Sequence, residues 1–278
     1  MSRTDAALIG LLALILTAPA FSAHTPPPSG LESGTNAPSE SQGNPASASD
    51  KIIIPPGKED LPAEQVFKNI EILRGKPASR LPGMMRTLNG LLGVGCTHCH
   101  VEGAWEKEEP PEKITARHMF HMIGEVNKTY FPDAQPGITC WTCHHGGPKP
   151  SMGNEEIGAA MQKLSPERKK LIAELTEKLG DKKDQPVEQV FANIQFFKGM
   201  PAARLLSVMN VFTIVLGVDC THCHVEGAWE KDDKKPKQVT RTMLRMVPDI
   251  NQQLFGSEFK VACWTCHRGV AEPENLPK

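Results

Sequence analysis

The chain has 278 residues, of which 31 are Lys or Arg and 32 are Asp or Glu, so its formal net charge is −1. Proteins that bind nucleic acids carry a basic surface that neutralises phosphates, and this charge balance argues against that class. At about 150 residues per domain, the length predicts two domains. Aromatic residues make up only 5% of the chain, which is little for two hydrophobic cores, so we expect another apolar group to fill them.

The first 50 residues are predicted to lie outside the folded part. Residues 1–23 combine an early arginine, a short apolar run and small residues, which is the layout of a secretory signal peptide. The apolar run is shorter than the roughly 20 residues of a transmembrane helix, and an uncleaved signal is the alternative. Residues 24–50 are rich in Pro, Ser, Gly and Asn and predict a disordered tether. We therefore expect a periplasmic or otherwise exported protein, associated with a membrane only through a partner or an uncleaved signal.

The rest of the chain is an internal duplication. The segment PAEQVFKNIEILRGKPASRL returns 124 residues later as PVEQVFANIQFFKGMPAARL, and CTHCHVEGAWEK recurs unchanged at the same offset. After a deletion of one residue, CWTCHHG pairs with CWTCHRG. The sequence therefore predicts two copies of one module, at residues 51–150 and 183–278, joined by a connecting segment at residues 151–182.

Each module has the pattern of a helical protein. In the first copy, apolar spacing and the positions of Gly and Pro predict helices at residues 62–73, 78–92 and 113–131. Strand signals are weak throughout, so we predict a mostly α fold. In the connecting segment, Ser165 as N-cap and Pro166 at the first helical position predict a helix that stops at Gly180. Its packing face is expected to consist of Leu171, Leu175 and Leu179.

All eight cysteines fall in four Cys-x-x-Cys-His motifs, and none is left over. Disulfides or zinc would explain paired cysteines, but neither explains a histidine directly after every pair. This is the attachment motif of c-type haem, in which two thiols form thioethers and the imidazole is the proximal iron ligand. The sequence predicts four covalent haems c. The attachment residues are Cys96, Cys99, Cys140, Cys143, Cys220, Cys223, Cys263 and Cys266, and the proximal ligands are His100, His144, His224 and His267.

Methionines are the candidates for the sixth iron ligands. Met85 and Met209 each lie eleven residues before the first motif of their module, and they are retained while the preceding residue varies, Met84 against Val208. Core packing is the ordinary role of such a residue, but this retention favours ligation. The last predicted helix of each module offers two further methionines, of which only one can reach a given iron. These pairs are Met119 with Met122 and Met243 with Met246.

The modules resemble the tetrahaem cytochrome c subunit family of photosynthetic reaction centres. The likeness lies in MMRTLNGLLGVGCTHCH and VMNVFTIVLGVDCTHCH, and in RHMFHMIGEVN and RTMLRMVPDIN ahead of the CWTCH motifs. It implies two pseudo-symmetric two-haem helical modules, with Met85, Met119 and Met209 as ligands. In the family the fourth haem usually takes a histidine from the loop before the second motif, and FPDAQPGIT has none. Internal symmetry then favours Met243, with a histidine of the other module as the alternative.

We expect an electron-transfer protein, not an enzyme, in which four bis-ligated irons relay single electrons between redox partner proteins. The resemblance implies a photosynthetic reaction centre as partner, and a respiratory complex, a small soluble cytochrome or a copper protein are alternatives. The competing function is a multihaem peroxidase or small-molecule reductase, which needs one open iron. Three arginines are candidates to pair with haem propionates. They are Arg86, Arg117 and Arg241.

Overall fold

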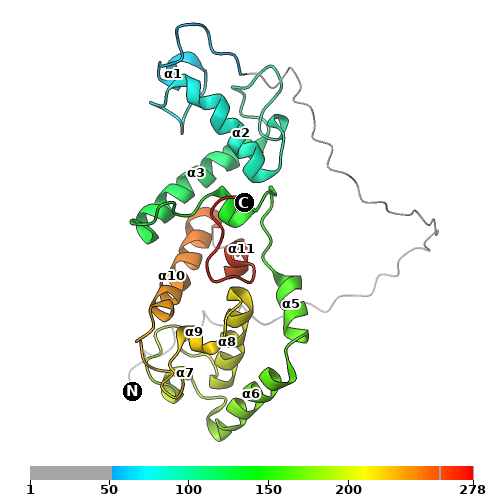
Figure 1. Ribbon diagram of the computed structural model, residues 1–278, viewed down its shortest axis with the longest axis vertical. Coiled ribbons are helices and arrows are strands. Elements are labelled where there is room, and N and C mark those ends of the chain that lie inside the picture. The colour runs from blue at the N-terminus through cyan, green and yellow to red at the C-terminus, as the bar shows by residue number, and fades with distance from the viewer. Residues whose placement is uncertain (1–51, 257, 278) are drawn as a thin grey trace, which may run out of the picture. The chain divides into compact units, whose positions relative to one another are not determined.

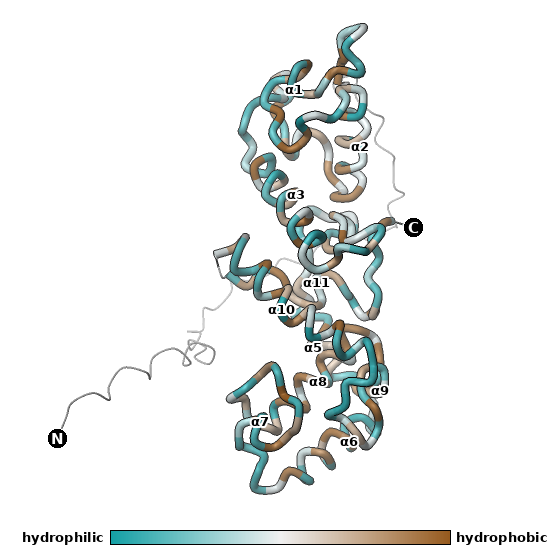
Figure 2. Tube along the Cα trace, turned by 90° about the vertical axis from the view of Figure 1, so that its left-hand side faces the viewer, coloured by the Kyte–Doolittle hydropathy of each residue, from teal (hydrophilic) through white to brown (hydrophobic). Residues whose placement is uncertain are grey.

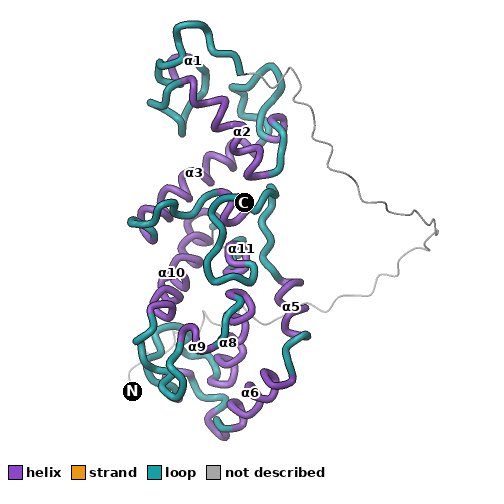
Figure 3. The backbone as a smooth tube through the Cα atoms, in the orientation of Figure 1, coloured by secondary structure: helices purple, strands orange, loops and turns teal. Residues whose placement is uncertain are grey.

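The computed structural model describes residues 52–256 and 258–277 (Figure 1). The predicted signal peptide and tether lie outside these residues. All of the described residues belong to one compact unit. Its described part is built of helices and loops without a strand (Figure 3), and extended pairing is limited to isolated bridges such as Pro62 with Pro77. The prediction of a mostly α fold is confirmed.

The first module contains two of the three helices that the sequence predicts. Its elements are α1 (Ala63–Val66), η2 (Ala78–Arg80), α2 (Leu81–Leu92), η3 (Cys96–His98), α3 (Pro111–Tyr130) and α4 (Cys140–His144). The prediction of a helix at residues 62–73 is wrong. The observed helix, α1, has only four residues and ends before Phe67, whose backbone is extended. Asn69 then takes a left-handed conformation, with φ 58°, and its side chain bonds to Glu108 and to the Glu106 carbonyl. These long-range contacts outweigh the local helical periodicity.

The connecting segment and the second module follow the same plan. Their elements are α5 (Asn154–Gln162), α6 (Pro166–Glu177), η4 (Gly180–Lys182), α7 (Val187–Val190), α8 (Ala202–Leu216), α9 (Cys220–Cys223), α10 (Lys235–Phe255) and α11 (Cys263–His267). The N-cap prediction is confirmed, because Ser165 Oγ accepts a bond of 3.2 Å from the Arg168 amide. The packing face is partly wrong, since Leu171 is 47% exposed. Arg168 holds α6 against α8 instead, through a 2.7 Å bond to Thr213.

The conventional hydrophobic core is small. The largest fully buried side chains are Val187, Val215, Thr142 and Thr265. A cluster of Val126, Met246 and Ile250 joins α3 to α10, and α8 carries a long hydrophobic stretch (Figure 2). Among the described residues no aromatic side chain is completely buried, so the helices leave apolar surface that this chain alone does not cover.

The two modules exchange their ends. Beyond α11, the Asn275 side chain accepts a 2.7 Å bond from Thr142 of α4, and its carbonyl accepts one from Thr139. Beyond α4, Gly153 lies so close to Trp264 of α11 that a Cβ there would come within 2.1 Å of the indole. The segment that follows the last Cys-x-x-Cys-His motif of each module therefore contacts the last motif of the other module, and α4 and α11 lie together.

A glycine contact should decide the stability of this arrangement. Gly217 ends α8 with φ 63°, and a Cβ there would lie 2.0 Å from the Gly269 carbonyl oxygen. Gly256 ends α10 with φ 56° and nothing within 4 Å of its Cβ position. Left-handed backbone costs an L residue about 1–2 kcal/mol, and Gly217→Ala adds a backbone clash that Gly256→Ala does not.

We therefore expect Gly217→Ala to lower the free energy of unfolding by about 3 kcal/mol or more and Gly256→Ala by about 1–2 kcal/mol. Denaturant unfolding followed by circular dichroism measures both. Equal losses in the two variants would contradict the role given to the contact between Gly217 and Gly269.

Candidate functional site

The four motif histidines share one geometry: in each, the ring Nδ1 is bonded to a backbone carbonyl. The pairs are His100 with Trp105 at 3.0 Å, His144 with Gly147 at 2.9 Å, His224 with Trp229 at 2.9 Å and His267 with Val270 at 3.0 Å. A carbonyl only accepts, so Nδ1 carries the proton and Nε2 keeps a free lone pair. Burial lowers the pKa of all four rings, which favours the neutral form that binds iron.

The motifs fall into two structural types. In the CTHCH motifs, the first and third, the acceptor carbonyl lies five residues after the histidine and belongs to the tryptophan of GAWEK. In the CWTCH motifs, the second and fourth, it lies three residues on. There the residue after the histidine, His145 or Arg268, ends the helix in a left-handed conformation.

One large cavity connects the attachment sites. Its volume is about 1030 Å³, and both cysteines and the histidine of each CWTCH motif line it. Cys99 and Cys223 of the CTHCH motifs also line it, as do both methionines of each pair, Met119 and Met122 on α3 and Met243 and Met246 on α10. Ligand pockets commonly measure about 300–1,000 Å³, so this space suits a large apolar group.

Not every predicted site residue lies at this cavity. Met85 and Met209 are half-buried on α2 and α8 and are not among its lining residues. His100 and His224 also lie outside it. The CWTCH motifs of the two modules do meet, with Cys143 Sγ and Cys266 Sγ 2.9 Å apart.

The residues present fit haem c. All eight cysteines are free thiols, as thioether formation requires. Around the CWTCH motifs, Trp141 Nε1 and Arg268 Nε are buried donors without a partner. A buried donor left unpaired costs about 1–3 kcal/mol, so these atoms indicate an acceptor supplied by a bound group, and carboxylates such as propionates match them. The apolar cavity matches the macrocycle.

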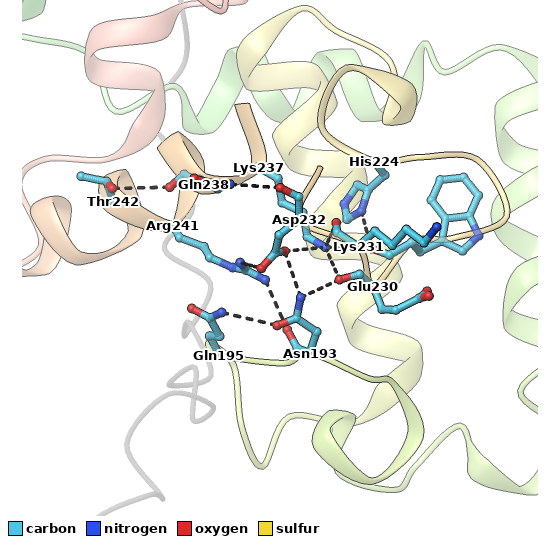
Figure 4. Close-up of polar contacts among 11 residues, drawn as sticks. Asn193, Gln195, His224, Glu230, Lys231, Asp232, Lys237, Gln238, Arg241 and Thr242 are labelled. Atoms are coloured by element: carbon cyan, nitrogen blue, oxygen red, sulfur yellow. Dashed lines mark hydrogen bonds and ion pairs between the residues drawn. The ribbon is translucent and has the colours of Figure 1, made fainter. Parts of the chain in front are cut away.

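A polar cluster holds the loop that follows each CTHCH motif. In the second module Asp232 accepts a 2.6 Å bond from Arg241 and a 2.9 Å bond from Asn193 (Figure 4). In the first module Glu108 takes this place and accepts a 2.7 Å bond from Arg117. Arg117 and Arg241, the candidates for propionate pairing, each already have a carboxylate partner within the chain.

Two residues of this cluster were missed by sequence reasoning. Lys113 and Lys237 are each 9% exposed, although lysine is almost never buried without a partner. The sequence did contain a signal for these lysines. They occupy the same position in the two repeats, and each lies in the first turn of a helix, where a positive charge is unfavourable. Burial lowers the pKa of Lys113.

The Asp232 cluster should make the second module sensitive to acid. The hydrogen bond from Arg241, followed by that from Asn193, holds the pKa of Asp232 far below its ordinary value. A depressed carboxyl pKa contributes stability above the unfolded pKa of about 3.9, and this contribution is lost as the pH falls further. Asp232→Asn should therefore lower stability at pH 7 and flatten its pH dependence between about pH 4 and pH 2.

The measurement is the melting temperature across this pH range, with Asp133→Asn as control, a carboxylate outside the cluster. An unchanged acid profile in Asp232→Asn would contradict the assignment.

Helices that carry four motifs of paired thiols with a neutral imidazole, two of them on one apolar cavity, form the architecture of a multihaem cytochrome c. A family model described as photosynthetic reaction centre cytochrome C subunit matches residues 28–154 and again residues 151–277. The chain belongs to that family, and the two matches confirm the duplication.

Curated relatives agree with this assignment. The photosynthetic reaction center cytochrome c subunit of Thermochromatium tepidum is 25% identical over 258 residues, which is 76% of this chain and 61% of the relative. That of Rubrivivax gelatinosus is 25% identical over 256 residues, covering 76% and 68%. Cytochrome c-554 of Chloroflexus aurantiacus is 33% identical over 85 residues, covering 29% and 20%. The chain thus spans less than two thirds of the first relative.

Within residues 52–256 and 258–277, none of the helices is both long enough and apolar enough to cross a membrane.

Proposed function

We propose that this chain carries four haems c and passes single electrons between redox proteins outside the cytoplasm. The observation that carries the proposal is that all four motif histidines have Nδ1 held by a carbonyl and Nε2 free. Bound haem supplies a one-electron Fe(III)/Fe(II) couple. The chain's part is to tether the group through two cysteines per motif, to present the histidine and to exclude water with the helices around the cavity.

Four methionines complete the proposed ligand sets: Met85, Met119, Met209 and Met243. Methionine and histidine together raise the reduction potential of a haem, so we propose mid-to-high potentials. The two CWTCH motifs lie side by side although they come from different modules. This contact supports a path for electrons from one module to the other.

A photosynthetic reaction centre is the proposed partner, because the relatives carry that name. A respiratory complex, a small cytochrome or a copper protein would take the same electrons. Haem c is attached outside the cytoplasmic membrane, so the predicted signal peptide at residues 1–23 supports export. The membrane association that we propose runs through the partner or an uncleaved signal.

Counting haems tests the proposal. The full chain, produced with the haem c maturation system in a periplasm, should give four haems per chain by pyridine haemochrome, all low-spin. Fewer than four would contradict it. One high-spin haem that binds carbon monoxide would instead favour the oxidoreductase alternative with an open iron.

A further inference from the structure

Each module buries a lysine where physical chemistry disfavours one. Lys113 is the third residue of α3, and Lys237 is the third residue of α10. At a helix N-terminus the macrodipole opposes a positive charge, and burial of an ammonium group is costly unless it is well paired. Both lysines are nevertheless 9% exposed. An arrangement that occurs in both copies of the repeat points to a use for the cation.

The partners of these lysines are backbone carbonyls in the loop after the CTHCH motif. Lys237 Nζ donates to the carbonyls of Trp229 at 2.9 Å, Glu230 at 2.9 Å and Lys231 at 2.7 Å. All three ammonium protons are thereby used. In the first module, Lys113 Nζ donates at 2.9 Å to the equivalent tryptophan carbonyl, that of Trp105.

That tryptophan carbonyl is also the acceptor of the proximal histidine. Trp105 accepts from His100 Nδ1 at 3.0 Å. In the second module, where His224 and Lys237 are drawn in Figure 4, Trp229 accepts from His224 Nδ1 at 2.9 Å. One oxygen with two lone pairs therefore receives an imidazole N–H and an ammonium N–H. The cation withdraws electron density from the oxygen and so weakens its bond to the imidazole, which becomes a less basic iron ligand.

Both consequences favour the reduced iron. A less basic histidine stabilises Fe(III) less, and a nearby positive charge disfavours the more positive oxidation state. The CWTCH motifs have no such arrangement. His144 and His267 donate to the carbonyls of Gly147 and Val270, and within the described part of the chain no lysine bonds to either carbonyl.

We propose that Lys113 and Lys237 are positioning residues that raise the reduction potentials of the haems at the two CTHCH motifs by acting on the carbonyl that holds each proximal histidine. The inference rests on the proposed function and divides the four haems into two classes that share the same predicted ligands. In the CTHCH class a buried lysine shares its acceptor carbonyl with the proximal histidine. In the CWTCH class no described lysine does so, and Arg268 donates to the carbonyl of Cys143 instead.

The modules differ in how closely a carboxylate approaches the cation, because Glu108, Glu106 and Glu71 act on Lys113 only from beyond ion-pair distance. Asp232 Oδ1 lies 3.3 Å from Lys237 Nζ, whereas no carboxylate of the described residues lies at ion-pair distance from Lys113. A counter-charge reduces the field that a cation exerts on its surroundings. The effect of the lysine should therefore be larger in the first module.

The test replaces each lysine by methionine in the holoprotein, since methionine keeps an unbranched stem and removes the charge. Midpoint potentials are read from a redox titration that resolves the four haems. Lys113→Met should lower the equilibrium constant for reduction of one haem about tenfold. For a one-electron couple this lowers the midpoint potential by about 59 mV. Lys237→Met should lower that of a different haem by less. Lys170→Met, at an exposed site on α6, is the control and should move none.

Charge and structure are separated by three further variants. Lys113→Arg keeps the cation, and the equilibrium constant for reduction of this haem should stay within threefold of its original value. Lys113→Gln keeps a donor without the charge and should lower the potential, and it replaces the methionine variant if that variant loses a haem. Asp232→Asn should act in the opposite direction and raise the potential of the haem that Lys237→Met lowers.

Potentials that stay fixed in the methionine and glutamine variants, or that move equally for all four haems, would overturn the inference. A wild-type chain with fewer than four haems would contradict the proposed function itself. The two failures are therefore distinguishable, because the first requires a protein that still holds four low-spin haems.

Discussion

Replacing both Cys263 and Cys266 by alanine should remove one haem and disturb a second. These thiols line the cavity of about 1030 Å³ that the second and fourth motifs share, and Cys266 lies 2.9 Å from Cys143 of the other module. A group that binds only the folded state stabilises it, so loss of this haem should destabilise the fold. The part of the cavity that this haem would fill is then left empty beside the haem of the second motif. We expect haem content to fall from four to three and the second motif's haem to change its spectrum.

The matched control is the alanine pair at Cys220 and Cys223. Of these two thiols, only Cys223 lines the cavity. This variant should also lose one haem, but the spectra of the two haems at the CWTCH motifs should stay close to those of the wild type. Pyridine haemochrome counts measure the haem content, and low-temperature absorption spectra measure the spectra of the remaining haems. Identical spectra of the remaining haems in the two double variants would argue against a shared cavity.

The attachment chemistry was readable from the sequence because it is local. A Cys-x-x-Cys-His motif specifies its own turn, and the duplication repeats it, so four candidate sites follow without any knowledge of the fold. The sparse core was also predictable from the low aromatic content, and the structure agrees, since its largest fully buried side chains are valine and threonine.

Long-range contacts limited the prediction elsewhere. The helix expected at residues 62–73 stops early because Asn69 reaches a loop 37 residues further on, and no local pattern encodes that distance. The meeting of α4 with α11 depends on the exchanged chain ends, such as Asn275 on Thr142. Which carbonyl each histidine selects is likewise a property of the folded loop.

The buried lysines show a different limit. Lys113 and Lys237 are visible in the repeat alignment, but their positions read as ordinary solvated charges beside Glu and Asp. Burial and the shared tryptophan carbonyl give them a role, and both appear only in three dimensions. In other repeated sequences, a positive charge that both copies retain at a predicted helix N-terminus would indicate such a buried lysine.

The two methionines of α10 should respond differently to replacement. Both methionines line the cavity, but Met246 is only 7% exposed and belongs to the buried cluster with Val126 and Ile250, whereas Met243 is partly buried beside that cluster. Met243→Ala should therefore leave one iron without its sixth ligand. Its haem should become high-spin, lose its methionine-to-iron charge-transfer band, bind carbon monoxide when reduced and fall in potential, because methionine ligation raises the potential.

Met246→Ala provides the comparison. We expect it to keep four low-spin haems and to lower the free energy of unfolding by about 2–5 kcal/mol, the usual cost of truncating a buried methionine. Carbon monoxide titration of the reduced protein distinguishes the two variants, with one equivalent bound per chain in Met243→Ala and none in Met246→Ala. The reverse pattern would assign the ligand to Met246. Four low-spin haems in both variants would instead assign the sixth position to a histidine of the other module.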